Sequence, residues 1–459
     1  MTGGMCPLEK RPRWHYQNFT NMPVTTEFAD MKLNRKSLVG FAFLMSATAQ
    51  VQAQDTDFSV RQALDGYTAE EVRGWVAGFS LADALAAGRP ALWFGTNGSQ
   101  VFPTALIPSR HPASEFQIWE REAVGEISAE TALGQLTLEE FVTHPESGMR
   151  GVLIVNEGQI VYEAYPGMLQ TDSHVTASSS KVFAGLVIDK LIEEGLIEED
   201  APIGSYVDEF VGSAWENIPV VDVLDMSTGL NPIDGPAYFA DPTNISARLL
   251  TAEMGDSDES MLDVLLDAEP VAESGSGFTY SSTATQALVL LAEAASGEPW
   301  AQIFDTRIWS HVRSDAPVQV HLTPDGIAVA HGFMSMGLRD LARYGMLFTP
   351  SQDQVTVAEV VTSEILERTQ SAQRTAEWYR NGPSAEKFME RLGDDSVRGA
   401  GRQWDAIWED GDFFKSGLNT QGIYVSPDRD LVIVYFAIDG TQQFQRYLRP
   451  LATSGLFGE

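Results

Sequence analysis

One short run, Ser178-Ser179-Ser180-Lys181, constrains the fold and chemistry of this chain more than any other feature. It opens an apolar stretch at residues 182–188, which predicts a buried helix. Residues three apart share one face of a helix, so the Lys181 amine is expected beside the Ser178 hydroxyl. A serine hydroxyl needs a neighbouring base to become a nucleophile, and burial favours the uncharged lysine that a base requires. The run therefore predicts a serine nucleophile with a lysine base.

A second run of the same pattern, Ser384-Ala385-Glu386-Lys387, follows Pro383 in a charged stretch. No apolar run long enough for a buried helix accompanies it, so we expect an exposed helix start there. Both residue types are common, and a serine-rich helix cap is the alternative interpretation of Ser178 taken alone. Other parts of the chain are needed to distinguish a nucleophilic serine from a helix cap.

Composition and charge exclude several classes of protein. A chain of 459 residues with 44% hydrophobic content can bury one large core or two moderate ones. A net charge of −34 argues against nucleic acid as a partner, because phosphate binding needs clustered lysines and arginines. The seven histidines are scattered and form no His-Glu-x-x-His, so we expect neither a metal nor another cofactor.

The N-terminus has the pattern of an export signal. Residues 31–36 form a segment that contains three basic residues, residues 38–47 are mostly apolar, and Val51-Gln52-Ala53 offers a cleavage site. We expect a signal peptide at residues 31–53, preceded by an upstream extension at 1–30. The apolar segment is too short for a stable membrane span. The one cysteine, Cys6, lies in this leader, so a mature chain without thiols would suit the bacterial periplasm or medium.

The body of the chain predicts an α/β (α+β) fold. Two β-rich runs within residues 152–163 are joined at Asn156-Glu157-Gly158, which predicts a hairpin. Residues 200–345 are mainly helical segments and long loops, and residues 413–425 and 431–436 again predict strands. Strands at both ends indicate one antiparallel sheet flanked by helices, with a mainly helical subdomain beside it.

Six segments in order resemble the serine β-lactamase and penicillin-binding-protein superfamily, over roughly residues 145–445. The resemblance implies a β-lactamase/transpeptidase-like fold, with an N-terminal lead-in region at 54–145 and a serine hydrolase domain at 146–459. The segments are the hairpin 151–162, Ser178-x-x-Lys181, Val223-Leu224-Asp225-Met226-Ser227-Thr228-Gly229-Leu230, Gly277-Phe278-Thr279-Tyr280-Ser281-Ser282, Arg339-Asp340-Leu341-Ala342-Arg343-Tyr344-Gly345 and Lys415-Ser416-Gly417.

Within this superfamily the chain looks most like the branch of esterases and nylon-oligomer (aminohexanoate-dimer) hydrolases. In that branch a Gly-Ile-His-Gly-Gln-like segment replaces the Lys-Thr-Gly strand, ten residues ahead of a turn proline. Gly417-Leu418-Asn419-Thr420-Gln421 lies ten residues ahead of Pro427, with Asn419 where histidine is common. Lys415-Ser416-Gly417 also resembles the Lys-Thr-Gly element, which leaves open whether Lys415 reaches the site.

The resemblance implies a role for each catalytic residue. Ser178 would form an acyl-enzyme, Lys181 would accept its proton or hold the hydroxyl, and Tyr280 would pass a proton to the leaving group. A phenol has an ordinary pKa near 10, so this role is expected to need cations that lower it. Lys181 and Lys415 are the candidate cations.

Further residues are implied to bind the substrate. The oxyanion donors would be the backbone N–H of Ser178 and one from the strand after Gly417, such as that of Asn419. Tyr238 matches a loop tyrosine that contacts the substrate amide in the nylon-oligomer branch, although a plain loop aromatic is equally compatible. Ser282 stands where class C β-lactamases have the asparagine that binds the antibiotic side chain, so β-lactam hydrolysis is expected to be slow.

These residues predict an exported serine hydrolase that cleaves linear ester or amide bonds in a small molecule. One alternative is a D-alanyl peptidase or class C-like β-lactamase. The other is a catalytically weak peptidoglycan-binding or sensor protein, which would have no need of Ser178, Lys181 and Tyr280 together. The sequence leaves the oligomeric state open.

Overall fold

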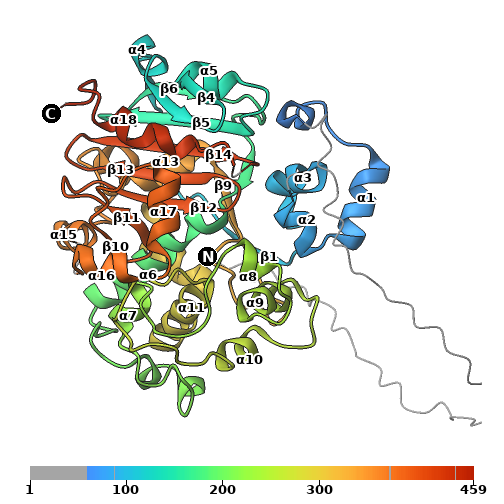
Figure 1. Ribbon diagram of the computed structural model, residues 1–459, viewed down its shortest axis with the longest axis vertical. Helices are drawn as coiled ribbons and strands as arrows, with labels where there is room; N and C mark the ends of the chain where they lie inside the picture. The colour runs from blue at the N-terminus through green and yellow to red at the C-terminus, as the bar shows by residue number, and fades with distance from the viewer. Residues whose placement is uncertain (1–58, 87, 372–373, 440, 459) are drawn as a thin grey trace, which may run out of the picture. The chain divides into compact units, whose positions relative to one another are not determined.

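An eight-stranded sheet forms the centre of the fold in the computed structural model (Figure 1). The structure describes residues 59–458 apart from 87, 372–373 and 440. The leader predicted at residues 1–53, with Cys6, lies outside the described residues. No helix among residues 59–458, with those gaps, is long and apolar enough to cross a membrane.

Strands from both ends of the chain build this sheet, as predicted. Its order is β10-β11-β12-β13-β14-β5-β6-β2, and all neighbours are antiparallel except the parallel pair β2 and β6. The pairing of β14 with β5 joins the C-terminal strands to the early hairpin. The bounds are β10 Gly399–Gly401, β11 Trp404–Ile407, β12 Phe413–Gly417, β13 Gln421–Ser426, β14 Leu431–Ala437, β5 Met149–Asn156, β6 Gln159–Ala164 and β2 Gln117–Ile118.

Two turns in the sheet show how local sequence sets its shape. The β5–β6 hairpin is confirmed, and Glu157 and Gly158 both have positive φ, 52° and 75°, as a tight hairpin turn requires. The single strand expected over residues 413–425 is wrong, because a turn divides it into β12 and β13. In that turn Asn419 and Thr420 have φ of 58° and 66°, a left-handed conformation that ends the strand.

Helices cover the sheet and form a separate helical part of the same unit. The helix α13 (Leu338–Met346) packs on β13, β14 and β5, and a Cβ at Gly345 would lie 2.5 Å from Val432, so glycine permits this close approach. The buried α6 (Lys181–Glu193) packs along α11 (Ser282–Ser296). The mainly helical part that was predicted contains α7 Val220–Leu224, α8 Pro236–Phe239, α9 Ile245–Met254, α10 Met261–Leu266 and α12 Trp300–Arg307 (Figure 1).

The lead-in region contributes to both larger sheets. A second sheet has the order β1-β8-β9-β7, and β1 (Thr104–Ile107) comes from the lead-in region, as does β2 of the central sheet. The helix α3 (Arg89–Asn97) contacts β7 (Ser173–Val175), immediately before Ser178. The remaining elements are α1 Ala69–Gly78, α2 Leu81–Leu85, α4 Glu122–Gly125, β3 Ser128–Thr131, β4 Gly134–Thr137, α5 Leu138–Thr143, β8 Val318–His321, β9 Met334–Gly337, α14 Gln352–Val355, α15 Ser363–Ser371, α16 Ala376–Asn381, α17 Ala385–Leu392 and α18 Leu448–Ala452.

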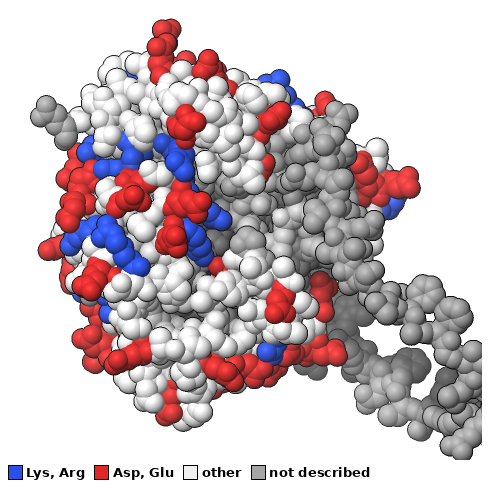
Figure 2. Space-filling model, in the orientation of Figure 1, with Lys and Arg blue, Asp and Glu red and all other residues white. Residues whose placement is uncertain are grey.

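The surface carries the acidic character of the composition. On the face shown in Figure 2, acidic side chains are scattered over the described surface among uncharged ones, and lysines and arginines stand among them. Several partly exposed arginines form ion pairs, as Arg449 does with Asp410 and Arg248 with Glu259. Exposed pairs of this kind each contribute little to stability, on the order of 0–1 kcal/mol.

Candidate active site

A strained turn presents Ser178 at the start of α6. The serine lies in the 3-10 turn Ala177–Ser180, between β7 and α6. Ala177 has a φ of 45°, a left-handed conformation that costs on the order of 1–3 kcal/mol in a residue with a Cβ. Neighbouring bonds hold the turn in place, since Thr176 N–H donates to Met334 and Ser180 Oγ donates to Ala330. Ser178 is partly exposed, whereas Ser179 and Ser180 are buried.

Lys181 is fully buried beside the serine, as predicted from their spacing. Its Nζ lies 3.1 Å from Ser178 Oγ, 2.9 Å from Ser282 Oγ and 2.8 Å from the His331 carbonyl oxygen. Burial lowers the pKa of Lys181 to about 7, and the charge of Asp234 acts in the opposite direction. A neutral amine has two hydrogens and one lone pair. If the hydrogens go to Ser282 and His331, the lone pair is left for the Ser178 proton.

Tyr280 lies in the same cluster, but the state of its phenol differs from the expectation. Burial raises the pKa of Tyr280 well above its usual value, the carboxylates of Asp405 and Asp234 raise it further, and a hydrogen bond with the Ser178 side chain acts in the opposite direction. The Nζ atoms of Lys181 and Lys415 lie 5.3 and 4.3 Å from the ring centre. The expected lowering of this pKa is therefore wrong, chiefly because the phenol is buried and secondly because two carboxylates lie near it.

Lys415 reaches the site, which settles the question left open by its sequence. It lies on β12 with its Nζ 3.3 Å from the Tyr280 hydroxyl. Its ammonium forms an ion pair with Asp405 on β11, and both side chains are fully buried. The other oxygen of Asp405 accepts hydrogen bonds from the backbone N–H and the hydroxyl of Ser416, at 2.8 and 2.6 Å. Sequence reasoning missed Asp405, whose partners lie ten and more residues away.

Ser282 and Asp234 extend the hydrogen bonds of Lys181. Ser282, the first residue of α11, accepts from Lys181 and donates to Asp234 Oδ2 at 2.5 Å. Asp234 is buried, and its Oδ1 has no hydrogen-bond partner among the described residues. Sequence reasoning placed Ser282 in the site but missed Asp234, which lies in the loop singled out only for Tyr238.

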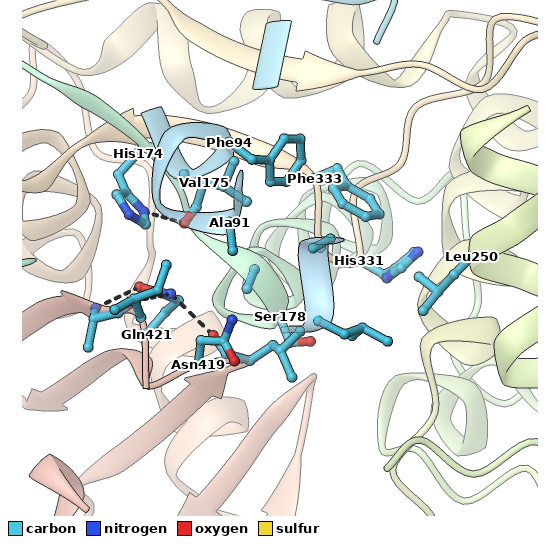
Figure 3. A pocket seen from close by; sticks show the side chains of 18 of the residues that line it. Ala91, Phe94, His174, Val175, Ser178, Leu250, His331, Phe333, Asn419 and Gln421 are labelled. Atoms are coloured by element: carbon cyan, nitrogen blue, oxygen red, sulfur yellow. Dashed lines mark hydrogen bonds between the residues drawn. The ribbon is translucent and has the colours of Figure 1, made fainter. Parts of the chain in front are cut away.

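The start of the β12–β13 turn lies close to Ser178. A Cβ at Gly417 would lie 2.8 Å from the Thr176 carbonyl oxygen and 3.2 Å from Ala177 Cβ, so only glycine fits between strand and turn. Asn419, in the turn itself, lies beside Ser178 in the cavity (Figure 3). Both positions agree with the implied oxyanion donors, and that role stays a prediction.

Tyr238 and its neighbour occupy different surroundings. Tyr238 is 38% exposed on the short helix α8, whereas the adjacent Phe239 lines the cavity beside Ser178. Contact between Tyr238 and a substrate amide stays a prediction.

The second Ser-x-x-Lys run is buried against the site, and the exposed helix start expected there is wrong. Ser384 is fully buried, and its Oγ accepts the backbone N–H of Tyr280 at 2.8 Å. Lys387 donates to the Asp234 carbonyl oxygen, and its Nζ lies 4.8 Å from the centre of the Tyr280 ring. Burial lowers the pKa of Lys387 to about 8. The sequence did carry a signal, since Ala385, Phe388 and Leu392 form an apolar stripe at helical spacing.

His331 lines the cavity but pairs away from the serine. Its Nε2 lies 2.7 Å from Glu253 Oε2, and both side chains are buried. Its carbonyl oxygen accepts a hydrogen bond from Lys181, so His331 positions that side chain through its backbone. No group of three or more His, Cys, Asp or Glu side chains among the described residues is arranged to hold a metal ion.

A cavity of about 110 Å³ opens beside Ser178 (Figure 3). One wall comes from α2 and α3, and the opposite wall comes from the β12–β13 turn and the end of β14. Its lining residues are Ala84, Leu85, Ala91, Phe94, Gly95, His174, Val175, Ala177, Ser178, Phe239, Leu250, Ser282, His331, Gly332, Phe333, Leu418, Asn419, Gln421, Ala437 and Ile438.

Comparison with known sequences decides the family. The sequence model of the β-lactamase family matches residues 138–454. The chain belongs to the β-lactamase family. It is 28% identical over 369 residues to a 6-aminohexanoate-dimer hydrolase of Paenarthrobacter ureafaciens, covering 76% of this chain and 88% of that one. The protein is therefore a serine hydrolase of this family.

Solved structures confirm the fold. A Bacillus anthracis protein assigned as a 6-aminohexanoate-dimer hydrolase matches with a TM-score of 0.66 and 22% identity, over 80% of this chain and 93% of that one. A β-lactamase/D-alanine carboxypeptidase from Yersinia pestis matches with a TM-score of 0.53 and 14% identity, over 68% and 95%. The β-lactamase/transpeptidase-like fold predicted from sequence is thus confirmed.

Proposed function

We propose that this hydrolase cleaves linear ester or amide bonds through an acyl-enzyme on Ser178. The observation that supports this most is the 3.1 Å distance between Lys181 Nζ and Ser178 Oγ. Because burial lowers the pKa of Lys181 to about 7, a large fraction of the amine is uncharged at neutral pH. An uncharged amine at that distance can accept the serine proton.

In acylation, Lys181 takes the hydroxyl proton of Ser178 as Oγ bonds to the carbonyl carbon of the substrate. The bond to the leaving group then breaks, and Tyr280 gives that group its phenol proton. The Lys181 ammonium returns a proton to Tyr280, so both residues regain their starting states. In deacylation, water takes the place of the serine as nucleophile: it gives a proton to Lys181 as its oxygen bonds to the acyl carbon. The bond between that carbon and Ser178 Oγ then breaks, and the Lys181 ammonium gives Oγ the proton that restores the hydroxyl.

The preference for linear substrates rests on two observations. The relative from Paenarthrobacter ureafaciens is named for its action on the 6-aminohexanoate dimer. In addition, Ser282 stands at the position that binds the antibiotic side chain in class C β-lactamases, and its hydroxyl is already engaged by Lys181 and Asp234. It has little capacity left for a substrate amide.

A second candidate is a D-alanyl peptidase or class C-like β-lactamase. The observation in its favour is that Lys415, from the segment resembling Lys-Thr-Gly, lies 3.3 Å from the Tyr280 hydroxyl. A cation there can also serve a substrate carboxylate, which both peptidases and β-lactamases need to bind. Kinetics on both substrate classes distinguish the two candidates.

The test combines fluorophosphonate labelling, mass mapping and a panel of p-nitrophenyl esters, linear amides and nitrocefin. Labelling is expected on Ser178, and Ser178→Ala is expected to lose both labelling and hydrolysis while keeping its melting temperature. Ser179→Ala is the matched control, because the buried Ser179 hydroxyl has no hydrogen-bond partner among the described residues. Retained hydrolysis in Ser178→Ala, or labelling at another serine, would refute the proposal.

Export to the periplasm or medium is part of the proposal, and it is supported by the signal pattern at residues 31–53. Mass spectrometry of the protein from its host is expected to show an N-terminus at Gln54. A mature protein that retains residues 1–30 would refute this part.

A further inference from the structure

The cavity beside Ser178 has a wall that lies outside the segment matched by the family model. Ala84 and Leu85 come from α2, and Ala91, Phe94 and Gly95 come from α3, whereas the match begins at residue 138. Phe94 is fixed there by stacking on Phe79, with ring centres 4.5 Å apart. This part of the cavity is therefore a feature of the lead-in region.

The cavity is lined mostly by apolar side chains. None of the described residues that line it is Asp, Glu, Lys or Arg. Burial lowers the pKa of His174 to about 3, so that imidazole is neutral at physiological pH. His331 is paired with the buried carboxylate of Glu253, which does not line the cavity.

The polar side chains of the cavity are mostly engaged by the protein itself. The amide of Gln421 bonds to the backbone of Leu418 and Ala437 (Figure 3). His174 uses Nδ1 on the Val175 carbonyl oxygen. The buried Nε2 of His174 has no hydrogen-bond partner among the described residues, but it carries no charge. A charged group placed here would lose its hydration without meeting an opposite charge among the lining Asp, Glu, Lys or Arg residues, of which there are none, and this is strongly unfavourable.

We propose that this cavity receives the acyl part of the substrate, that this part is an uncharged hydrocarbon chain, and that α2 and α3 limit its length. The inference rests on the proposed acylation of Ser178, which stands at the cavity. It adds a statement about the substrate. An acyl chain with an ammonium or carboxylate at its far end is excluded, and kcat/KM for an apolar acyl chain rises with every methylene that fits the cavity.

The first test compares two esters of equal chain length, p-nitrophenyl heptanoate and p-nitrophenyl 6-aminohexanoate. In the second ester an ammonium replaces the terminal methyl group of the first, so the charge is the main difference between the two substrates. The measurement uses 0.2 M salt, because the net charge of −34 would otherwise attract the cationic ester. We expect kcat/KM to be more than tenfold lower for the amino ester. A ratio within tenfold would overturn the inference.

The second test changes the wall. From acetate to hexanoate, kcat/KM is expected to rise by up to about fourfold per methylene, since burial of one CH₂ contributes ~0.8 kcal/mol. Ala84→Leu fills the cavity and is expected to lower the hexanoate-to-acetate ratio at least fivefold. Ala82→Leu, on the exposed face of the same helix, is the matched control and is expected to leave that ratio unchanged. An unchanged ratio in Ala84→Leu would overturn the role of α2.

The outcomes separate this inference from the proposed function. Turnover of both esters at similar rates, lost in Ser178→Ala, would overturn the apolar acyl site and leave the serine mechanism standing. Absence of turnover and labelling at Ser178 would overturn the mechanism, and the acyl site with it.

Discussion

The Nζ of Lys415 lies 3.3 Å from the phenol oxygen of Tyr280, and the same ammonium is paired with the buried carboxylate of Asp405. The phenol thus lies beside a cation, and the carboxylate of Asp405 balances the charge of that cation. Burial, together with the carboxylates of Asp405 and Asp234, raises the pKa of Tyr280 and keeps the phenol protonated. A phenolate formed when the leaving group takes its proton would lie beside that ammonium, so the charge would form where a partner exists.

The state of Lys181 predicts how activity depends on pH. Burial lowers its pKa from the usual 10.5 to about 7, and only the neutral amine can accept the Ser178 proton. We therefore expect kcat/KM for a p-nitrophenyl ester to fall about tenfold per pH unit below about 7 and to level off above it. A profile that stays flat between pH 5 and 8.5 would show that Lys181 is not the base.

Lys181 and Tyr280 are expected to act as one unit with Ser178. Each passes on the proton that the other needs, so the loss of either interrupts the same transfer. Lys181→Ala and Tyr280→Phe should each lower kcat by several orders of magnitude, and the double variant little further. Multiplied losses in the double variant would mean that one of the two residues has only a structural role. Melting temperatures of all three variants serve as the control.

We expect the free energy of unfolding to depend on whether one or both charges of the Lys415–Asp405 pair are removed. Lys415→Met leaves the Asp405 carboxylate buried without its cation, and breaking a buried pair in this way costs about 3–5 kcal/mol. Lys415→Met combined with Asp405→Asn removes both charges and should recover most of that loss in chemical denaturation. If the double variant is no more stable than the single one, the carboxylate is not the source of the cost.

Ser384 is expected to position Tyr280. Its Oγ accepts the Tyr280 backbone N–H, and Ser384→Ala leaves that buried donor unsatisfied at a cost of about 1–3 kcal/mol. We expect lower kcat with little change in KM, and partial rescue by Ser384→Thr. Ser363→Ala, at the first residue of the distant α15, provides a matched serine control. A change in melting temperature without any change in kcat would assign Ser384 to stability alone.

The three groups predicted to do chemistry came from sequence because their signals are local or ordered along the chain. Ser178 and Lys181 are three residues apart, and Tyr280 stands in a segment whose order resembles a known superfamily. The central sheet was predictable for the same reason, since hairpin turns and apolar runs mark its strands.

The groups that tune this chemistry were not predictable in the same way. Asp234 and Asp405 gain their roles only from burial beside residues that are distant or non-adjacent in sequence. Ser384 and Lys387 have a Ser-x-x-Lys pattern that occurs in both exposed and buried helices, and the apolar stripe of α17 is too short to predict burial from sequence alone. The apolar wall from α2 and α3 likewise needs tertiary packing to reach the serine.

The last prediction concerns the class of substrate. Ser282 is held by Lys181 and Asp234, so the contact that a β-lactam side chain uses in class C enzymes is not free. The cavity beside Ser178 is instead lined mostly by apolar side chains, as an apolar chain requires. We expect short- and medium-chain p-nitrophenyl esters to exceed nitrocefin and a D-Ala-D-Ala peptide in kcat/KM, with each value divided by the uncatalysed hydrolysis rate. This division matters because activated substrates react quickly with any nucleophile. If nitrocefin or the peptide exceeds every ester by tenfold or more, about 1.4 kcal/mol in the barrier, the assignment to linear substrates is wrong.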